Sequence, residues 1–379
     1  MPGGASGASR VRLATIDLGT NTVRLLVADV DCARRGWRVV AADQRVTRLG
    51  EGMAATGRLG DGAADRTAAA VVEYVDRARR AGAVRLAIVA TSAVREAANG
   101  RHFAARLEQA TGARVTVVSG DEEAALTLAG VLAGLGEGPA TTPGTTLVFD
   151  IGGGSTESSR EDTRRSPPSA LRLGVVDLAE RYPFTGPVEW PRYRAMSTEI
   201  GERLRAELPA PLRTAGADRL VGTAGTVTTL AALDLDLRVY DAARVQGHAL
   251  SRADVERLLA RLAALTVDDR ARLPCLEPGR ADLIVAGTAI VLATLDIVRA
   301  ERLVVSDWGL REGSSSVWPP EAVRQHRVLA RKSSADRLAR HLTGSRPASI
   351  LERQVWTRSR YSCSTRRTSR SISPTPVAR

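Results

Sequence analysis

Two stretches of similar pattern, ATIDLGTNTVRLL at 14–26 and LVFDIGGGSTESS at 147–159, indicate how this chain of 379 residues is built. Each begins with an apolar run that ends in an acidic residue, Asp17 or Asp150, and continues through an apolar residue, glycine and small polar residues. Self-similarity of this kind is the sequence signature of a repeated unit. We therefore expect two domains of related fold, each with a carboxylate at the end of its first strand.

The segments around these stretches predict an α/β protein. Three runs rich in β-branched residues, at 11–17, 22–30 and 37–43, predict an antiparallel meander of strands. Apolar residues at helical spacing predict a helix from about 62 to 80, and the plan restarts at 145–150. Further strands are expected at 85–90, 114–119, 219–222 and 302–307, and further helices near 100–111, from 121, at 192–207 and up to 299.

Basic residues are concentrated at the C-terminus. The formal net charge is +12, but residues 314–379 contain fourteen Lys or Arg and three Asp or Glu, so residues 1–313 are nearly neutral. The Ser, Thr and Arg content of 314–379 predicts a disordered tail. Such a tail is either a solvated appendage or a non-specific binder of RNA or DNA, and the net charge says nothing about the substrate of the folded part.

Composition excludes several other classes of protein. The longest apolar stretch, 283–298, is shorter than a membrane span and contains Asp296, which predicts a buried helix and no membrane anchor. No signal-peptide pattern precedes the first strand, so a cytoplasmic protein is expected. The three cysteines are too widely spaced for a disulfide framework or a zinc site. The single lysine, Lys332, lies in the tail, so the folded part has no P-loop lysine.

Eight motifs in the same order resemble the exopolyphosphatase and guanosine-pentaphosphate phosphohydrolase family of the actin-like ATPase superfamily. They are IDLGTNTVRLLV from 16, ATSAVREAAN from 90, VVSGDEEAALTLAG from 117, VFDIGGGSTE from 148, RLGVVDLAERY from 172, VGTAGTVTTLAAL from 221, GHALS from 247 and RADLIVAGTAIV…LVVSDWGLREG at 280–313. The resemblance implies the short form of the family, with two actin-like (ribonuclease H-like) domains at 1–133 and 134–313. Each domain would hold a mixed sheet flanked by helices, with a cleft between the domains and the tail at 314–379 beyond them.

The resemblance also implies an activity. Members remove the terminal phosphate from inorganic polyphosphate, which makes exopolyphosphatase the expected function, or from guanosine pentaphosphate, and they use Mg²⁺ or Mn²⁺. No membrane partner is expected, and a homodimer is left open. A kinase of the same superfamily would share both loops but would need adenosine and carbohydrate pockets, for which the sequence shows no signature. A nucleic-acid-binding protein would depend on the tail alone.

Hydrolysis of a phosphoanhydride needs neutralised phosphate charge, an oriented water and a group that takes its proton. Asp150 and Glu157 flank the glycine loop, and hard carboxylate oxygens of this kind suit Mg²⁺, so both are predicted metal ligands. Backbone amides free of side chains can approach phosphate closely. The predicted phosphate-binding residues are Asp17, Thr20, Asn21, Ser92, Arg95, Gly152, Gly153, Gly154, Ser155 and Thr156.

The stretch SGDEEA at 119–124 is expected to open a helix, where acidic residues are favoured by the helix dipole whatever the function. The family resemblance assigns the catalytic base to the first glutamate of EEA, which is Glu122. A third small-residue loop, GTAGT at 222–226, precedes another helix whose N-terminus could hold a further phosphate, although a helix entry alone would explain it. The role of His248 is left open.

Overall fold

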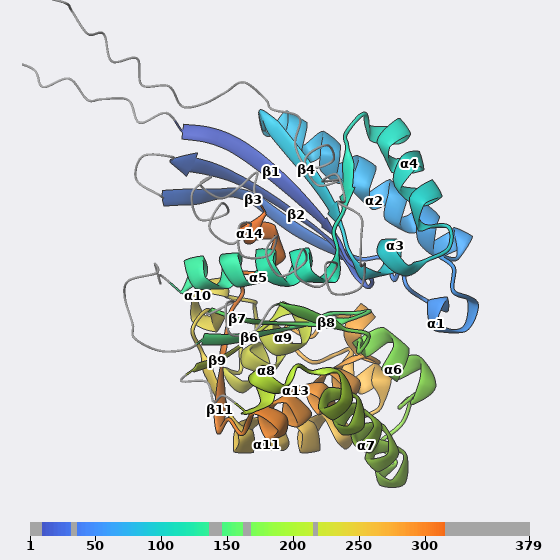
Figure 1. Cartoon of the computed structure of the whole chain (residues 1–379), viewed down its shortest axis with the longest axis vertical. Helices are drawn as coiled ribbons and strands as arrows, with labels where there is room; N and C mark the ends of the chain where they lie inside the picture. Colours follow the sequence, from blue (N-terminus) through green and yellow to red (C-terminus); the bar gives the residue numbers. More distant parts are fainter. Residues whose placement is uncertain (1–9, 32–35, 136–145, 162–167, 215–218, 315–379) are drawn as a thin grey trace, which may run out of the picture. The chain divides into compact units, whose positions relative to one another are not determined.

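The computed structural model describes residues 10–31, 36–135, 146–161, 168–214 and 219–314, and the predicted tail lies outside these ranges apart from Ser314. The described elements form an α/β structure with two mixed sheets, one in each half of the described chain (Figure 1). The strand of each sheet that precedes a predicted loop, β1 or β6, lies inside its sheet.

The first sheet has the order β3-β2-β1-β4-β5. Its strands are β1 (Arg10–Leu18), β2 (Thr22–Asp31), β3 (Gly36–Val46), β4 (Arg85–Ala90) and β5 (Val115–Val117). The first three form the predicted antiparallel meander, and β4 runs parallel to β1 and β5. Because side chains alternate across a strand, Ala14, Ile16 and Leu18 face one side together, where they pack with α2 (Asp61–Arg80) and α4 (Gly100–Thr111).

The second sheet repeats this plan in the order β10-β11-β9-β6-β7-β8. Its strands are β6 (Thr146–Ile151), β7 (Thr156–Arg160), β8 (Ser169–Leu171), β9 (Arg219–Thr223), β10 (Ala249–Ser251) and β11 (Arg302–Val305). β6 pairs antiparallel with β7 and parallel with β9, as β1 does with β2 and β4. The duplication predicted from the two similar stretches is therefore confirmed.

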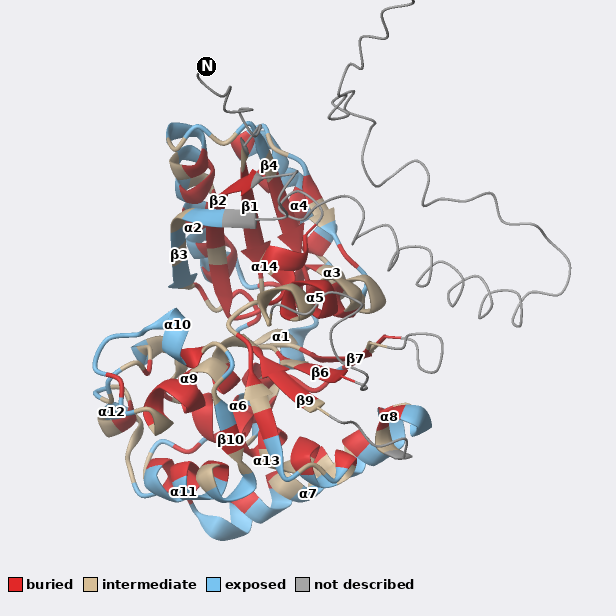
Figure 2. Cartoon of the chain, turned by 90° about the vertical axis from the view of Figure 1, so that its left-hand side faces the viewer, coloured by how far each residue is buried: buried red, intermediate tan, exposed pale blue. Residues whose placement is uncertain are grey.

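The larger core lies around the second sheet (Figure 2). Its helices are α6 (Val175–Arg181), α7 (Trp190–Glu207), α9 (Ala224–Asp234), α11 (Arg252–Ala263) and α13 (Ile284–Val298). α13 is apolar on nearly all sides and almost entirely buried, as predicted for 283–298. Within the described ranges, no helix combines the length and the apolar character needed to cross a membrane. The short helices are α1 (Met53–Thr56), α3 (Ser92–Glu96), α8 (Ala210–Thr214), α10 (Ala242–Val245), α12 (Val267–Arg270), α14 (Leu310–Gly313) and the 3₁₀ helix Pro278–Arg280.

Helix α5 (Gly120–Gly134) lies between the two sheets (Figure 1). Its Leu126 packs against the first sheet's Ala87 and Val89, while Leu128 and Val131 pack with strands of the second sheet. An amphipathic helix buries one stripe, but α5 is apolar around most of its circumference because both of these faces are covered. The predicted domain boundary at 133/134 falls at the end of this helix.

Candidate active site

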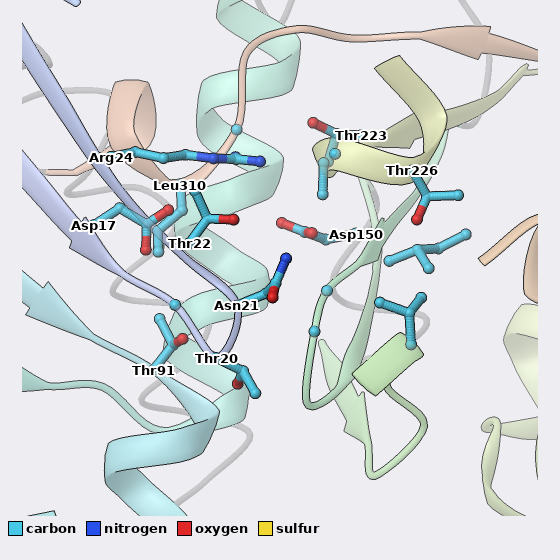
Figure 3. Close-up of a pocket in the computed structure, with 18 of the residues that line it drawn as sticks. Asp17, Thr20, Asn21, Thr22, Arg24, Thr91, Asp150, Thr223, Thr226 and Leu310 are labelled. Atoms are coloured by element: carbon cyan, nitrogen blue, oxygen red, sulfur yellow. The ribbon is translucent and has the colours of Figure 1, made fainter. Parts of the chain in front are cut away.

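One cleft collects the turns that follow the first strands of both sheets (Figure 3). The turn after β1, the glycine-rich turn after β6 and the junction of β9 with α9 all line it. Its polar lining consists of Asp17, Thr20, Asn21, Thr22, Arg24, Thr91, Ser92, Glu123, Asp150, Ser155, Thr223, Thr226, Arg280, Asp307, Arg311 and Glu312, with the backbone of Gly152, Gly153 and Gly154. The cleft predicted between two related halves is therefore present.

The glycine loop needs its glycines because the other half of the cleft lies against it. A Cβ atom on Gly154 would come within 2.6 Å of Thr20 Oγ1 and 2.7 Å of Ser92 Oγ. The carbonyls of Gly152 and Gly153 accept from the backbone N–H groups of Val175 and Val176, which fixes the loop to the start of α6. A larger residue at Gly154 would push the two halves apart.

Three of the carboxyl groups that line the cleft have a raised pKa. Burial raises the pKa of Asp17 to about 6 and the pKa of Glu123 to about 7. Burial also raises the pKa of Asp150, although nearby Arg24 and the Thr127 hydroxyl, which donates to Oδ2 at 3.1 Å, both lower it. Desolvation disfavours the charged form of all three carboxyls, and acidic neighbours add to this effect at Asp17 and Glu123. A cation bound beside these carboxyls would favour their charged forms.

Glu122, the predicted base, is not in the cleft. It is the third residue of α5, and its Oε2 accepts from the Ser119 backbone N–H at 2.9 Å, while its own N–H donates to Ser119 Oγ at 3.2 Å. This reciprocal pair is a capping box, which satisfies two N–H groups at the helix start. The next residue, Glu123, is buried and lines the cleft. The structure therefore brings Glu123 rather than Glu122 to the cleft, and the identity of the base stays a prediction.

Arg95 is bound to Glu123 and does not line the cleft, so its contact with phosphate stays a prediction. Its Nη1 donates to Glu123 Oε2 at 2.8 Å and to the Val118 carbonyl at 3.0 Å. Ser92, predicted with it, does line the cleft, and its hydroxyl donates to Glu96. Arg95 therefore orients Glu123 and lowers its pKa, partly offsetting the effect of burial.

Thr156 and Glu157 also lie outside the cleft lining, although the loop that precedes them is inside it. The Thr156 hydroxyl donates to the Leu173 carbonyl at 2.6 Å, and the Ser155 hydroxyl donates to Glu157 Oε1 at 2.5 Å. Both residues are at most 2% exposed because they are already part of strand β7. Glu157 nevertheless lies directly opposite Asp150 in the antiparallel pair of β6 and β7, so the metal site predicted for these two residues stays a prediction.

Three arginines of the cleft were missed by sequence reasoning. Arg24 reaches from β2 toward Asp150 and Thr223 (Figure 3). The register of the first hairpin places Arg24 directly opposite Asp17, so the short turn at 19–21 was a signal that could have revealed it. Arg280 and Arg311 come from segments distant in sequence, and only the tertiary fold brings them to the cleft.

Comparison with known proteins identifies the chain. A model of the Ppx/GppA phosphatase family matches residues 26–320. This chain belongs to that family. Exopolyphosphatase 2 of Mycobacterium tuberculosis is 36% identical over 318 residues, which cover 80% of this chain and 97% of that protein.

Solved structures agree with this assignment. The Ppx/GppA family member of Aquifex aeolicus matches with a TM-score of 0.67 and 29% identity, covering 84% of this chain and 99% of that chain. An exopolyphosphatase from Cytophaga hutchinsonii matches with a TM-score of 0.71 and 26% identity, covering 80% and 96%. The predicted fold of two actin-like domains with mixed sheets flanked by helices is thus confirmed. So is membership in a family of phosphoanhydride hydrolases.

The sequence left the roles of the GTAGT loop and His248 open, and the structure places the two differently with respect to the cleft. The loop GTAGT enters the cleft, where Thr223 and Thr226 line it at the start of α9. His248 lies away from the cleft lining, and its Nε2 is 2.8 Å from Asp234 Oδ2, so it joins the residue before β10 to the end of α9. The arrangement of His248 is that of a structural contact.

Proposed function

We propose that this chain is an exopolyphosphatase, which hydrolyses the terminal phosphoanhydride bond of inorganic polyphosphate. The observation that carries the proposal is that Glu123 faces the two phosphate-binding loops within one cleft. The name of the M. tuberculosis relative supports polyphosphate as the substrate. Guanosine pentaphosphate contains the same kind of bond, but no observation favours it over polyphosphate.

Phosphate oxygens would be held by the loops of both halves. Thr20 and Asn21 come from the first loop, and the backbone of the glycine loop comes from the second. Asn21 Oδ1 is buried and has no hydrogen-bond partner among the described residues. A buried polar atom without a partner is costly, so it is suited to a group supplied by the substrate or its water.

Arginines would bind the part of the polyphosphate chain beyond the terminal phosphate. Arg24, Arg280 and Arg311 line the same cleft, and Nε of both Arg280 and Arg311 is buried without a hydrogen-bond partner among the described residues. Guanidinium groups match phosphate geometry and stay charged. A chain of linked phosphates can contact several of them at once.

Glu123 would act as the general base. It accepts the proton of the attacking water at a carboxylate oxygen, while Arg95 fixes the other side of the carboxylate. Its pKa of about 7 is well suited, because a base is most effective when its pKa lies near the working pH. Attack of the water oxygen on the terminal phosphorus breaks the bridging P–O bond and releases phosphate.

Mg²⁺ or Mn²⁺ fits the residues that are present. Among the described residues, no three His, Cys, Asp or Glu side chains converge as a ready-made metal site. Mg²⁺ commonly uses one or two carboxylates together with waters and substrate phosphates, and Asp17 and Asp150 supply such a pair at the cleft. These two residues would hold the ion, which would neutralise charge on the phosphate.

The decisive experiment compares neighbouring glutamates. Phosphate release from tripolyphosphate, long polyphosphate, guanosine pentaphosphate and ATP is measured with and without Mg²⁺. Glu123→Gln should lower turnover on polyphosphate by roughly 10² to 10⁴, the usual contribution of a general base. Glu122→Gln is the matched control, because it changes only the helix cap and should cost stability without comparable loss of turnover. Equal small effects at both positions would disprove the assignment.

A further inference from the structure

A short segment after β3 supports the phosphate-binding loop of the first half. The backbone N–H groups of Thr47 and Arg48 both donate to the Asn21 carbonyl at 3.0 Å, and Gly50 N–H donates to the Thr20 carbonyl at 2.8 Å. These bonds leave the side chains of Thr20 and Asn21 available to the cleft. Any movement of residues 47–50 would therefore move the phosphate-binding loop.

Arg48 holds an unusual backbone conformation within this segment. Its φ of 53° lies in the left-handed region, which favours glycine and is disfavoured for a residue with a long side chain. Such conformations persist when the surrounding structure enforces them, and they concentrate at functional sites. This conformation allows the N–H groups of Thr47 and Arg48 to donate to the Asn21 carbonyl while the Arg48 side chain points away from that carbonyl.

The side chain of Arg48 crosses to the other half of the cleft. Its Nη2 donates to Asp282 Oδ1 at 2.7 Å and to the Gly279 carbonyl at 3.2 Å. Gly279 also packs tightly against the first half, because a Cβ atom there would lie 2.8 Å from Val46 Cγ1. Neither Arg48 nor Asp282 lines the cleft itself.

The two groups that Arg48 holds lie on either side of Arg280 in the sequence. Arg280 enters the cleft, donates from Nη2 to Thr22 Oγ1 at 3.2 Å and packs on the backbone of Gly225. A Cβ atom on Gly225 would lie 1.9 Å from Arg280 Nη1, so the guanidinium has little freedom on that side. The position of Arg280 thus depends on the turn that Arg48 holds.

We propose that Arg48 and Asp282 are positioning residues, which set the Thr20–Asn21 loop and Arg280 in register across the cleft. The inference rests on the proposed function, because both positioned elements would bind phosphates of one polyphosphate chain. The Arg48–Asp282 pair itself touches no substrate. Its side chains are 34% and 36% exposed, so as an isolated ion pair it contributes little to stability. Replacing either residue should therefore lower kcat/KM more than it lowers the melting temperature.

The chain offers a matched control. Arg66 and Glu51 form an ion pair of 2.8 Å near the same surface, with both side chains about half exposed. This pair lies entirely within the first half and does not cross the cleft. Loss of it removes the same kind of interaction without disturbing the register of the two halves.

The test uses the full chain with tripolyphosphate as the substrate. Asp282→Ala and Arg48→Ala should each lower kcat/KM by about 10-fold to 100-fold, since small misplacements of binding groups have effects of this size. Melting temperatures should stay close to that of the wild type. The double variant should be no worse than either single variant, because residues that act as a unit are not additive. Arg48→Lys should restore part of the loss, and Glu51→Gln should change nothing.

Two results would overturn the inference. One is an Asp282→Ala variant whose kcat/KM equals that of Glu51→Gln. The other is a loss that parallels a fall in melting temperature and is additive in the double variant. If the wild type releases no phosphate from either tripolyphosphate or long polyphosphate, the proposed function fails. In that case the positioning role of Arg48 and Asp282 is tested by binding. Tripolyphosphate should raise the melting temperature of the wild type and of Glu51→Gln, and it should raise that of Asp282→Ala by less.

Discussion

At the scale of single residues, two buried aspartates of the first sheet should respond to pH with opposite signs. Asp17 and Asp29 are 9% and 8% exposed. Burial raises the pKa of Asp17 to about 6, whereas hydrogen bonds from Arg12 and Arg38 lower the pKa of Asp29 to about 2. Folding therefore favours a proton on Asp17, and the stability it contributes falls as pH rises from about 4 to 6.

The consequence is measurable by thermal unfolding without substrate or metal. Asp17→Asn should raise the melting temperature at pH 8, where the wild type must hold a buried charge, and should have little effect near pH 4. Asp29→Asn should lower the melting temperature at pH 8, because it removes a paired carboxylate and leaves Arg12 without its partner. If both variants lowered the melting temperature at pH 8, the buried charge of Asp17 would not be destabilising the fold.

The sequence could predict most residues of the cleft but not all of their roles. Asp17, Thr20, Asn21, Asp150 and the glycines are close to their strands, so a strand-turn pattern was enough to place them. Glu122 and Glu123 differ by one residue in a helix, which rotates a side chain by about 100°. Only the register of α5 against both sheets decides which one faces the cleft.

At the scale of secondary structure, α5 and α14 pack so closely that glycine is required at their contact. A Cβ atom on Gly130 would lie 2.0 Å from the Gly309 carbonyl oxygen and 2.9 Å from Gly313 N, and these are backbone atoms that cannot rotate away. Gly130→Ala should destabilise the fold by about 1 to 3 kcal/mol, the usual cost of overpacking. Chemical denaturation measures this difference.

The control is a glycine in an open part of another helix. Gly62 in α2 is exposed, and the nearest atom to an added Cβ would be Arg66 Nη1 at 3.6 Å. Gly62→Ala should stabilise the fold by about 0.4 to 1 kcal/mol through the unfolded chain. If Gly130→Ala stabilised the fold as much as Gly62→Ala, α5 and α14 could not pack as closely as described.

The periodicity of apolar residues predicted the long helices and strands well, because these elements are buried either on one face or on all sides. α2 begins within a residue of its predicted start, and β4 spans the predicted 85–90. The strand β7 gave no such signal: its residues Thr156–Arg160 are mostly polar yet all buried. They are buried because α5 lies across them, and Ser159 donates to the Ala124 carbonyl at 2.9 Å. The pattern of residues within β7 cannot show that a helix distant in sequence covers them.

At the scale of the whole molecule, the residues proposed to act in catalysis and those that give the chain its net charge belong to different parts of the sequence. Every residue proposed to bind phosphate lies between positions 17 and 311, a region that carries almost none of the net charge of +12. The steering of a polyanion toward the protein depends on summed charge, whereas turnover depends on the cleft. The two properties should therefore be separable by shortening the chain.

Removal of residues 339–379 provides the test. This segment contains nine arginines and one acidic residue, Glu352. The shortened chain should hydrolyse tripolyphosphate with the kcat of the full chain, because it keeps the whole cleft. For long polyphosphate at low ionic strength, its KM should rise by about tenfold, and the difference should vanish as salt screens the charges. Retention of non-specific DNA binding by the shortened chain would show that the basic segment is not its source. A changed kcat on tripolyphosphate would show that the segment acts on the cleft itself.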